Sequence, residues 1–204
     1  VRLVRFCDDM IFILSRKEEG RDFEKMLRAR LAKIGIELNE AKSSLQPAGR
    51  WAIERLVKDG IRPPSFRFLG FELYWKRAIA GFYRLGYKPR ADRLRAKLKS
   101  IKEHLHRNRN TKNHIPLLKE VKQVVQGWVR YFSITDCGRL IHFFVTAVRR
   151  LIHRWFNHRG GRQFISWMRV SPILERIDFP TGPCRLRSMF PKSSKANQLH
   201  ISGA

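Results

Sequence analysis

The pattern of apolar and polar positions along this chain changes after its first 80 residues. Residues 1–6 and 10–14 are apolar and β-prone on either side of a short polar segment, which predicts a β-hairpin. In residues 20–34 apolar side chains recur three and four apart, which predicts an amphipathic helix ending at Gly35. The expected buried face of this helix is Phe23, Met26, Leu27, Leu31 and Ile34. Two short elements are expected next, a helix in residues 49–60 and a strand pair in residues 66–75.

Beyond residue 80 the apolar spacing predicts three long helices. The first follows Pro89, which suits a first helical turn, the second begins near Pro116, and the third spans residues 136–157. The expected apolar stripes are Leu94, Leu98, Ile101 and Leu105; Leu118, Val121, Val125, Trp128 and Phe132; and Leu140, Phe143, Phe144, Ala147, Leu151 and Trp155. Residues 164–170 add one apolar stretch before a segment rich in Pro, Ser and basic residues. We therefore predict an α+β chain with parts 1–80 and 81–160 and a loosely ordered basic tail, 161–204.

The net charge of the chain indicates which class of molecule it binds. The chain of 204 residues has 43 Lys and Arg against 17 Asp and Glu, a net charge of +26. Residues 81–160 alone hold 19 basic and 4 acidic residues. Such an excess increases self-repulsion unless a polyanion offsets it, and nucleic acid is the polyanion that fits best, with an anionic membrane surface as the rival. Because no apolar run approaches the roughly 20 residues of a membrane span, we expect no membrane partner.

The cysteines and histidines bear on the compartment and on metal binding. Cys7, Cys137 and Cys184 lie far apart, which suits neither a zinc site nor a disulfide framework. We therefore expect a reduced, intracellular protein, cytoplasmic or organellar. The paired histidines, 104/106 and 153/158, are not joined by a cysteine or carboxylate cluster, so they suggest no metal site. Val1 begins inside an apolar run, and we expect residues before it to be missing.

The polar tip of the predicted hairpin contains adjacent carboxylates, Asp8 and Asp9. Two neighbouring negative charges repel each other, and a divalent cation relieves that repulsion. Phosphoryl transfer uses such carboxylates because paired metal ions hold the attacking and leaving oxygens. The alternative is an ordinary acidic β-turn, since Asp is a common turn residue.

Three segments occur in the order found in one protein family. Residues 6–9, Phe-Cys-Asp-Asp, resemble the Tyr-x-Asp-Asp box of reverse transcriptases, with Phe in place of Tyr and Cys where intron-encoded members usually carry Ala. Residues 31–43 resemble the next motif of the polymerase palm, and residues 68–71, Phe-Leu-Gly-Phe, resemble its primer-grip hairpin. The chain thus resembles a reverse transcriptase of the group II intron maturase kind.

The resemblance implies roles for particular residues. Asp8 would bind both catalytic Mg²⁺ ions and Asp9 would support one of them. Lys42 would meet the incoming triphosphate, although an ordinary surface lysine remains the alternative. Phe6 would lie near the nucleotide or the primer end. The residues implied for holding the primer end are Phe68, Leu69, Gly70 and Phe71. Cys7 is interpreted as a small packing residue, because no histidine stands near it in sequence to act as a base.

A second resemblance lies in the basic helices. Residues 127–132, Gly-Trp-Val-Arg-Tyr-Phe, resemble part of the maturase-specific, or X, domain, which is the thumb of the polymerase. The family usually shows Leu-Asn-Pro-x-x-Arg-Gly-Trp, whereas residues 121–128 lack the Asn, Pro and Arg. Independently of the family, three amphipathic helices with this charge predict a bundle with cationic outer faces, and a solvated helix surface is the alternative. The candidate phosphate-binding residues are Arg93, Lys97, Arg130, Arg149, Arg150 and Arg154. Trp128, Tyr131 and Trp155 are interpreted as core residues.

Two functions remain open. The first is an RNA-directed DNA polymerase and splicing maturase, with group II intron RNA, an RNA template, a DNA primer and dNTPs as partners. The second is a binding protein only, in which the basic bundle helps intron RNA to fold. A reverse transcriptase without a splicing function is a third option, which residues 127–128 argue against. Because a two-metal site needs a further Asp and the fingers, neither of which is in this chain, we predict no polymerase activity for the chain alone.

Overall fold

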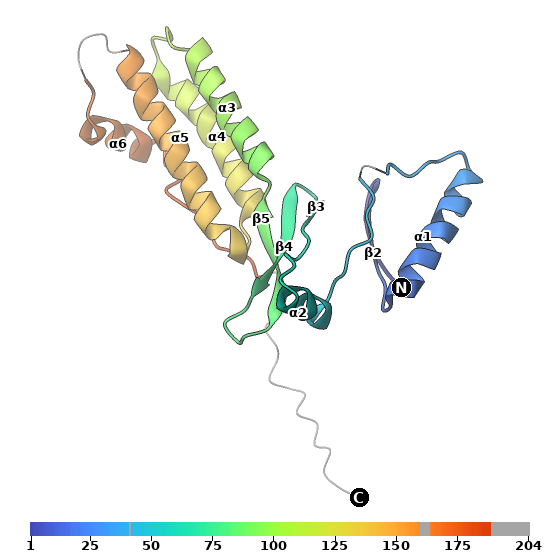
Figure 1. The fold of residues 1–204 in the computed structure, drawn as a ribbon. Helices are drawn as coiled ribbons and strands as arrows, with labels where there is room; N and C mark the ends of the chain where they lie inside the picture. The colour runs from blue at the N-terminus through green and yellow to red at the C-terminus, as the bar shows by residue number, and fades with distance from the viewer. Residues whose placement is uncertain (41, 160–163, 189–204) are drawn as a thin grey trace, which may run out of the picture. The chain divides into compact units, whose positions relative to one another are not determined.

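The structure is a computed structural model that describes residues 1–40, 42–159 and 164–188 (Figure 1). It divides into two compact units, residues 1–86 and the residues from Tyr87 onward. The expected α+β class is confirmed, because the described residues form both α-helices and two small antiparallel sheets. Each unit is described by itself below.

The first unit begins with the predicted β-hairpin. Strand β1 (Arg2–Phe6) pairs antiparallel with β2 (Asp9–Ile13), and Phe6 lies opposite Asp9 in the register. Cys7 and Asp8 therefore form a two-residue turn, and Cys7 takes a φ of 53°. A positive φ is typical of such short hairpin turns. The hairpin prediction is confirmed without the Asn-Gly or Asp-Gly pair that usually marks it.

Helix α1 (Lys17–Ala32) follows the hairpin and packs on it only in part. The rings of Phe12 and Phe23 lie 4.7 Å apart and join the two elements. The predicted buried face of this helix is only partly correct, because Met26 is 66% and Ile34 is 67% exposed, whereas the other three predicted residues are half-buried. A two-stranded hairpin is too narrow to cover a whole helical face. Gly20 is the one residue of this helix that is buried.

The rest of the first unit is a short helix and a small sheet. Helix α2 (Arg50–Lys58) buries Ile53, which confirms the short helix expected there. Strands β3 (Phe66–Phe68), β4 (Phe71–Arg77) and β5 (Tyr83–Pro89) form a sheet in the order β3-β4-β5. The strand pair was predicted but β5 was not, and Pro89 ends that strand instead of opening a helix. Gly86 lies within β5, where a Cβ would be 3.0 Å from Tyr74 Cζ, so the ring packs over the glycine.

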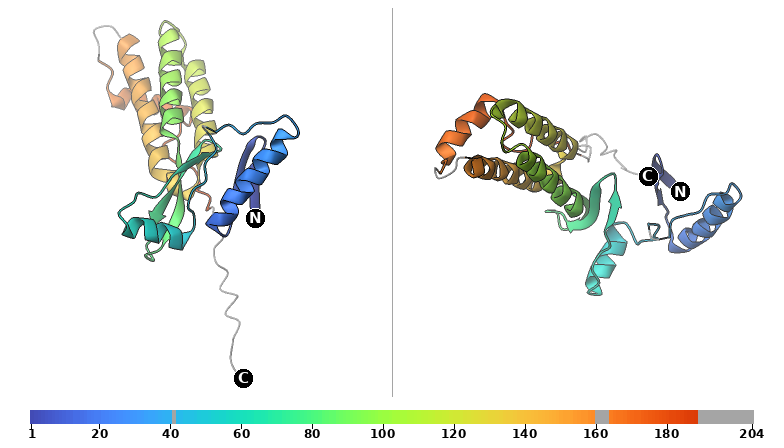
Figure 2. Two further views of the ribbon diagram at one scale, coloured as in Figure 1. Left: turned by 45° about the vertical axis from the view of Figure 1, so that its right-hand side comes forward. Right: turned by 90° about the horizontal axis from the view of Figure 1, so that it is seen from above.

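The second unit is built on three long helices that lie side by side in all views (Figures 1 and 2). They are α3 (Ala91–Arg107), α4 (His114–Phe132) and α5 (Gly138–Arg159), and a 3₁₀ turn, η1 (Thr135–Cys137), precedes α5. The α4 stripe predicted from sequence is buried throughout. No helix in the described part of the chain is both long and apolar enough to cross a membrane.

The predicted stripe of the third helix is displaced from the real one. Phe143 is 55% exposed, whereas Ile141 and Val145 beside it are fully buried. Helix α5 contacts α3, α4 and η1, so it buries a wide face. The side chains buried along this helix are Ile141, Phe144, Val145, Val148, Ile152, Trp155 and Phe156. Apolar residues occur almost all round this helix, and periodicity alone therefore did not select the buried side.

Residues 164–188 pack on the bundle, where a loosely ordered tail was expected. They form α6 (Trp167–Arg176) and an irregular segment that returns to the turn between α4 and α5. The buried apolar side chains of this region are Val170, Leu174, Ile177 and Phe179. The Arg187 amide donates to the Ser133 carbonyl at 2.9 Å, and the Thr135 amide donates to the Arg187 carbonyl at 3.1 Å. The other parts of the predicted tail, 161–163 and 189–204, lie outside the described residues.

Candidate nucleic-acid interface

The acidic tip of the first hairpin lies in solvent. Asp8 occupies the turn and Asp9 opens β2, and both are exposed. Phe6, beside them at the end of β1, is 57% exposed. The Arg5 guanidinium donates from Nε to the Cys7 carbonyl at 3.0 Å, which supports the turn. The hairpin thus presents two adjacent carboxylates and an aromatic ring at one end.

The two carboxylates suit Mg²⁺ only as part of a site. Their oxygens are the ligand type that Mg²⁺ prefers. Among the described residues, however, no group of three His, Cys, Asp or Glu side chains is placed to hold a metal ion. A two-metal site needs more ligands than two adjacent carboxylates supply.

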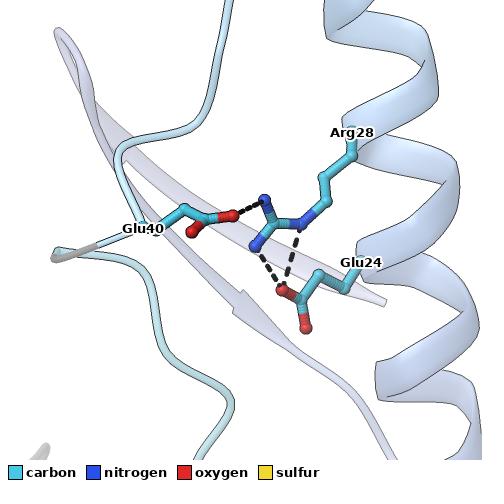
Figure 3. Close-up of polar contacts among 3 residues, drawn as sticks. All are labelled: Glu24, Arg28 and Glu40. Atoms are coloured by element: carbon cyan, nitrogen blue, oxygen red, sulfur yellow. Dashed lines mark hydrogen bonds and ion pairs between the residues drawn. The ribbon is translucent and has the colours of Figure 1, made fainter.

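Lys42 lies in a turn that is tied back to α1. The Lys42 and Ser43 amides donate to the Asn39 carbonyl at 3.1 and 2.9 Å. Two residues before Lys42, the Glu40 carboxylate accepts from Arg28 Nη1 at 3.1 Å (Figure 3).

Arg28 also binds Glu24, at 2.8 Å from Nη2 and 3.3 Å from Nε. The hydrogen bond to Glu24 is the largest cause that raises the pKa of Arg28. The guanidinium thus joins the loop to one side of α1, while the Lys42 side chain stays exposed.

The Phe-Leu-Gly-Phe segment forms the tight hairpin between β3 and β4. Phe68 lies opposite Phe71, and both turn residues take positive φ, 48° for Leu69 and 78° for Gly70. Positive φ at both positions is the geometry of a type I′ turn, in which a leucine is unusual. Both phenylalanines are half-buried and Gly70 is buried. The segment is thus a tight hairpin whose rings are partly accessible.

The predicted phosphate-binding residues are distributed over all three long helices. Arg93, Arg130, Arg150 and Arg154 are exposed, and Lys97 and Arg149 are half-buried. Some basic side chains in this unit have acidic partners, such as Lys122, whose Nζ lies 3.4 Å from Asp178 Oδ2. Residues 81–160 hold 19 basic and 4 acidic residues, and residues 161–204 hold 7 basic and 2 acidic residues, so acidic side chains can neutralise only a minority of the positive charge. The helical unit therefore presents a net cationic surface.

The structure also contains a pocket that the sequence did not reveal. It lies between α5, the start of α6 and the segment after α6, with a volume of about 440 Å³. Its lining residues are His142, Thr146, Arg149, Arg150, Trp167 and Thr181. Only the two arginines were predicted as site residues. Trp167 and Thr181 were missed because residues 161–204 were expected to be a loose tail. His142 and Thr146 were missed because no segment was expected to pack against their side of α5.

The comparison with protein families found a match in the helical unit. Residues 91–169 match the family model described as the group II intron, maturase-specific domain. Residues 91–169 are therefore similar to the maturase-specific domain of group II intron proteins. The match covers α3, α4 and α5 and extends into α6, so the resemblance stated for these helices is confirmed. Neither the comparison with curated proteins nor that with solved structures found a match.

Within the matched residues, Gly127 and Trp128 have different surroundings. Trp128 is buried and stacks on Phe144, with ring centroids 4.0 Å apart and planes at 29°. Gly127 lies in the same helix, but a Cβ at this position would meet nothing within 4 Å. Trp128 and Trp155 are core residues as predicted, whereas Tyr131 is 51% exposed and is not.

Proposed function

We propose that this chain binds group II intron RNA through its maturase-specific domain and so assists the splicing of the intron. The observation that carries the proposal is the family match at residues 91–169, which covers the helices with the largest excess of positive charge. A structured RNA is recognised largely by shape and by unpaired bases, so no sequence-reading motif is required.

The physical basis of binding is the release of counterions from the RNA. Each phosphate that pairs with a basic side chain releases condensed cations, so affinity falls as salt concentration rises. Exposed arginines suit this role because the planar guanidinium donates to a phosphate in a bidentate manner. Arg93 on α3, Arg130 on α4 and Arg154 on α5 supply such groups from each of the three helices. Lys97 on α3 and Arg149 and Arg150 on α5 add three further basic side chains.

The test measures the affinity of the chain for a fluorescent group II intron RNA over a range of salt concentrations. We expect Arg93→Gln combined with Arg154→Gln to weaken binding and to lower the salt slope by roughly 1.5, since each phosphate contact contributes about 0.7–0.9. The matched control is Arg16→Gln combined with Arg67→Gln, which removes the same charge from exposed positions of the first unit. Equal losses in both double variants would contradict the assignment of binding to the helical unit.

A second candidate function is RNA-directed DNA polymerisation. The hairpin that exposes Asp8 and Asp9 next to Phe6 favours it, as does the tight Phe68–Phe71 hairpin. In this function Mg²⁺ would be held by Asp8 and Asp9 with a further ligand, and it would neutralise charge on the phosphates of the incoming dNTP. Lys42 would bind the triphosphate, and the Phe68–Phe71 hairpin would hold the DNA primer on its RNA template.

The polymerase candidate is tested by primer extension on an RNA template, using the protein that contains this chain. Asp8→Ala should abolish Mg²⁺-dependent extension and leave intron RNA affinity within about twofold, because an exposed turn residue of the first unit does not support the helical unit. If Asp8→Ala changes neither extension nor splicing, the chain acts as an RNA-binding maturase only.

A further inference from the structure

The pocket beside α5 is lined by side chains from three segments: α5, the start of α6 and the segment after α6. His142, Thr146, Arg149 and Arg150 occupy positions i, i+4, i+7 and i+8 of α5, a spacing that puts them on one helical face. Trp167 forms the wall beyond the arginines. The opposite wall lies at Thr181, since a Cβ on the adjacent Gly182 would approach within 3.6 Å of His142 Nδ1.

One face of the Trp167 ring is covered by a residue of α5. The ring stacks on His153 with centroids 4.5 Å apart and planes at 6°. His153 Nε2 lies 2.9 Å from the Ile165 carbonyl oxygen. Asn157 Oδ1 accepts from the Ile165 amide at 2.7 Å. The start of α6 is thus fastened to α5 two residues before the tryptophan, while 38% of Trp167 remains exposed.

The lining of the pocket matches the parts of one nucleotide. Two guanidinium groups suit a phosphate, an indole suits the face of a base, and the Thr146 hydroxyl and His142 ring offer hydrogen bonds to a sugar or a base edge. None of the six lining residues is acidic, so nothing in the lining repels an anion. The volume of about 440 Å³ lies within the range of about 300–1,000 Å³ typical of small-ligand sites.

We propose that this pocket binds a single unpaired nucleotide of the RNA, with its base against Trp167 and its phosphate at Arg149 and Arg150. The inference rests on the proposed RNA-binding function and adds a specific subsite to it. A base inside a duplex is already stacked on both sides and does not reach such a pocket, whereas a bulged or looped base does. Because His153 covers one side of Trp167, the site accepts one base and not a continuous stack.

The experiment compares two fluorescent RNA hairpins that differ only in one bulged nucleotide, 2-aminopurine, and measures their affinity for the whole chain at fixed salt. We expect the bulged hairpin to bind about tenfold more tightly, the magnitude of one base–aromatic contact, and its 2-aminopurine fluorescence to be quenched. Trp167→Ala should remove the preference and the quenching, and Trp167→Phe should keep most of both. The matched control is Trp51→Ala, which removes an exposed tryptophan of the first unit and should change neither.

Because Trp167→Ala removes part of a packed wall, a second variant keeps the test independent of folding. Thr181→Phe adds a ring at an exposed position of the pocket and should also abolish the preference by filling it. Equal affinity of the wild-type chain for both hairpins would overturn this inference while leaving the proposed function intact. A full preference retained by Trp167→Ala would overturn it as well. If the wild-type chain binds none of the three RNAs, the two hairpins and the intron RNA, the proposed function itself would be overturned.

Discussion

The three cysteines show how the fold separates residues that look alike in sequence. Cys7 and Cys184 are exposed, and Cys184 Sγ lies 2.8 Å from Ser133 Oγ. Cys137 is fully buried in the turn before α5, and its Sγ donates to the Tyr87 carbonyl at 3.5 Å. Burial raises the pKa of the Cys137 thiol to about 11, with a smaller contribution from Asp136.

These surroundings predict selective alkylation. With iodoacetamide at pH 8, Cys7 and Cys184 should react well before Cys137, because the thiolate is the reactive form and a pKa of about 11 instead of 9.0 reduces its population about a hundredfold. Peptide mass spectrometry at successive times measures the three rates. A sample denatured in urea is the control, and all three cysteines should react there at similar rates. Rapid modification of Cys137 in the native chain would contradict its burial.

Helix α4 has a buried apolar stripe on one side and, on the other, a glycine with no neighbouring side chain within 4 Å of the position that a Cβ would take. Its stripe from Leu118 to Phe132 follows strict three- and four-residue spacing, which explains why it was predicted correctly. Gly127 lies on the opposite, exposed side with empty space around it. A glycine inside a helix is destabilising, and packing within the described residues gives no reason for it.

The empty space beside Gly127 predicts that Gly127→Ala stabilises the chain. The free energy of unfolding should rise by about 0.5–1 kcal/mol, because alanine loses less backbone entropy in a helix and its methyl group meets no neighbour. Urea denaturation followed by circular dichroism measures the change. Ala96→Gly, at an exposed position of α3, is the matched reverse change and should lower the free energy by a similar amount. A loss of stability in Gly127→Ala would show that the position is more crowded than the structure indicates.

At the scale of the whole molecule, the net charge of +26 dominates solution behaviour. Like charges on a compact chain repel each other and oppose folding, and salt screens this repulsion over distances near 10 Å at 0.1 M. The same salt weakens RNA binding by reducing the gain from counterion release. Stability and RNA affinity are therefore expected to respond to salt in opposite directions.

This opposition is directly measurable. Raising NaCl from 20 to 200 mM should raise the thermal midpoint by a few degrees, since roughly 1 kcal/mol corresponds to about 2–4 °C in a chain of this size. A group II intron RNA added at 20 mM NaCl should raise the midpoint further, because a ligand of the folded state stabilises it. Sucrose at matched osmolality serves as the control for effects unrelated to charge. A midpoint that stays constant across this salt range would argue against significant self-repulsion.

Most elements of this protein follow from local pattern alone. The acidic hairpin was predicted from two apolar, β-prone runs on either side of a polar tip. The α4 stripe and the three long helices were predicted from the 3.6-residue periodicity, which is a property of neighbouring residues in the chain. The excess of positive charge in residues 81–160 could also be counted from the sequence. The resemblance of residues 127–132 to the maturase-specific domain was also visible in the sequence, and the family match confirms it.

Tertiary contacts decided which residues are buried where the apolar periodicity fits more than one helical face. Helix α5 is apolar on several sides, so only its contacts with α3, α4 and η1 selected Ile141 and Val145 over Phe143 for burial. Residues 164–188 have a weak pattern of their own and acquire structure by packing on the bundle. The pocket at Trp167 forms where His153 and Asn157 of α5 contact Trp167 and Ile165 at the start of α6. Burial depends on which surfaces meet, and the order of residues along one helix does not contain that information.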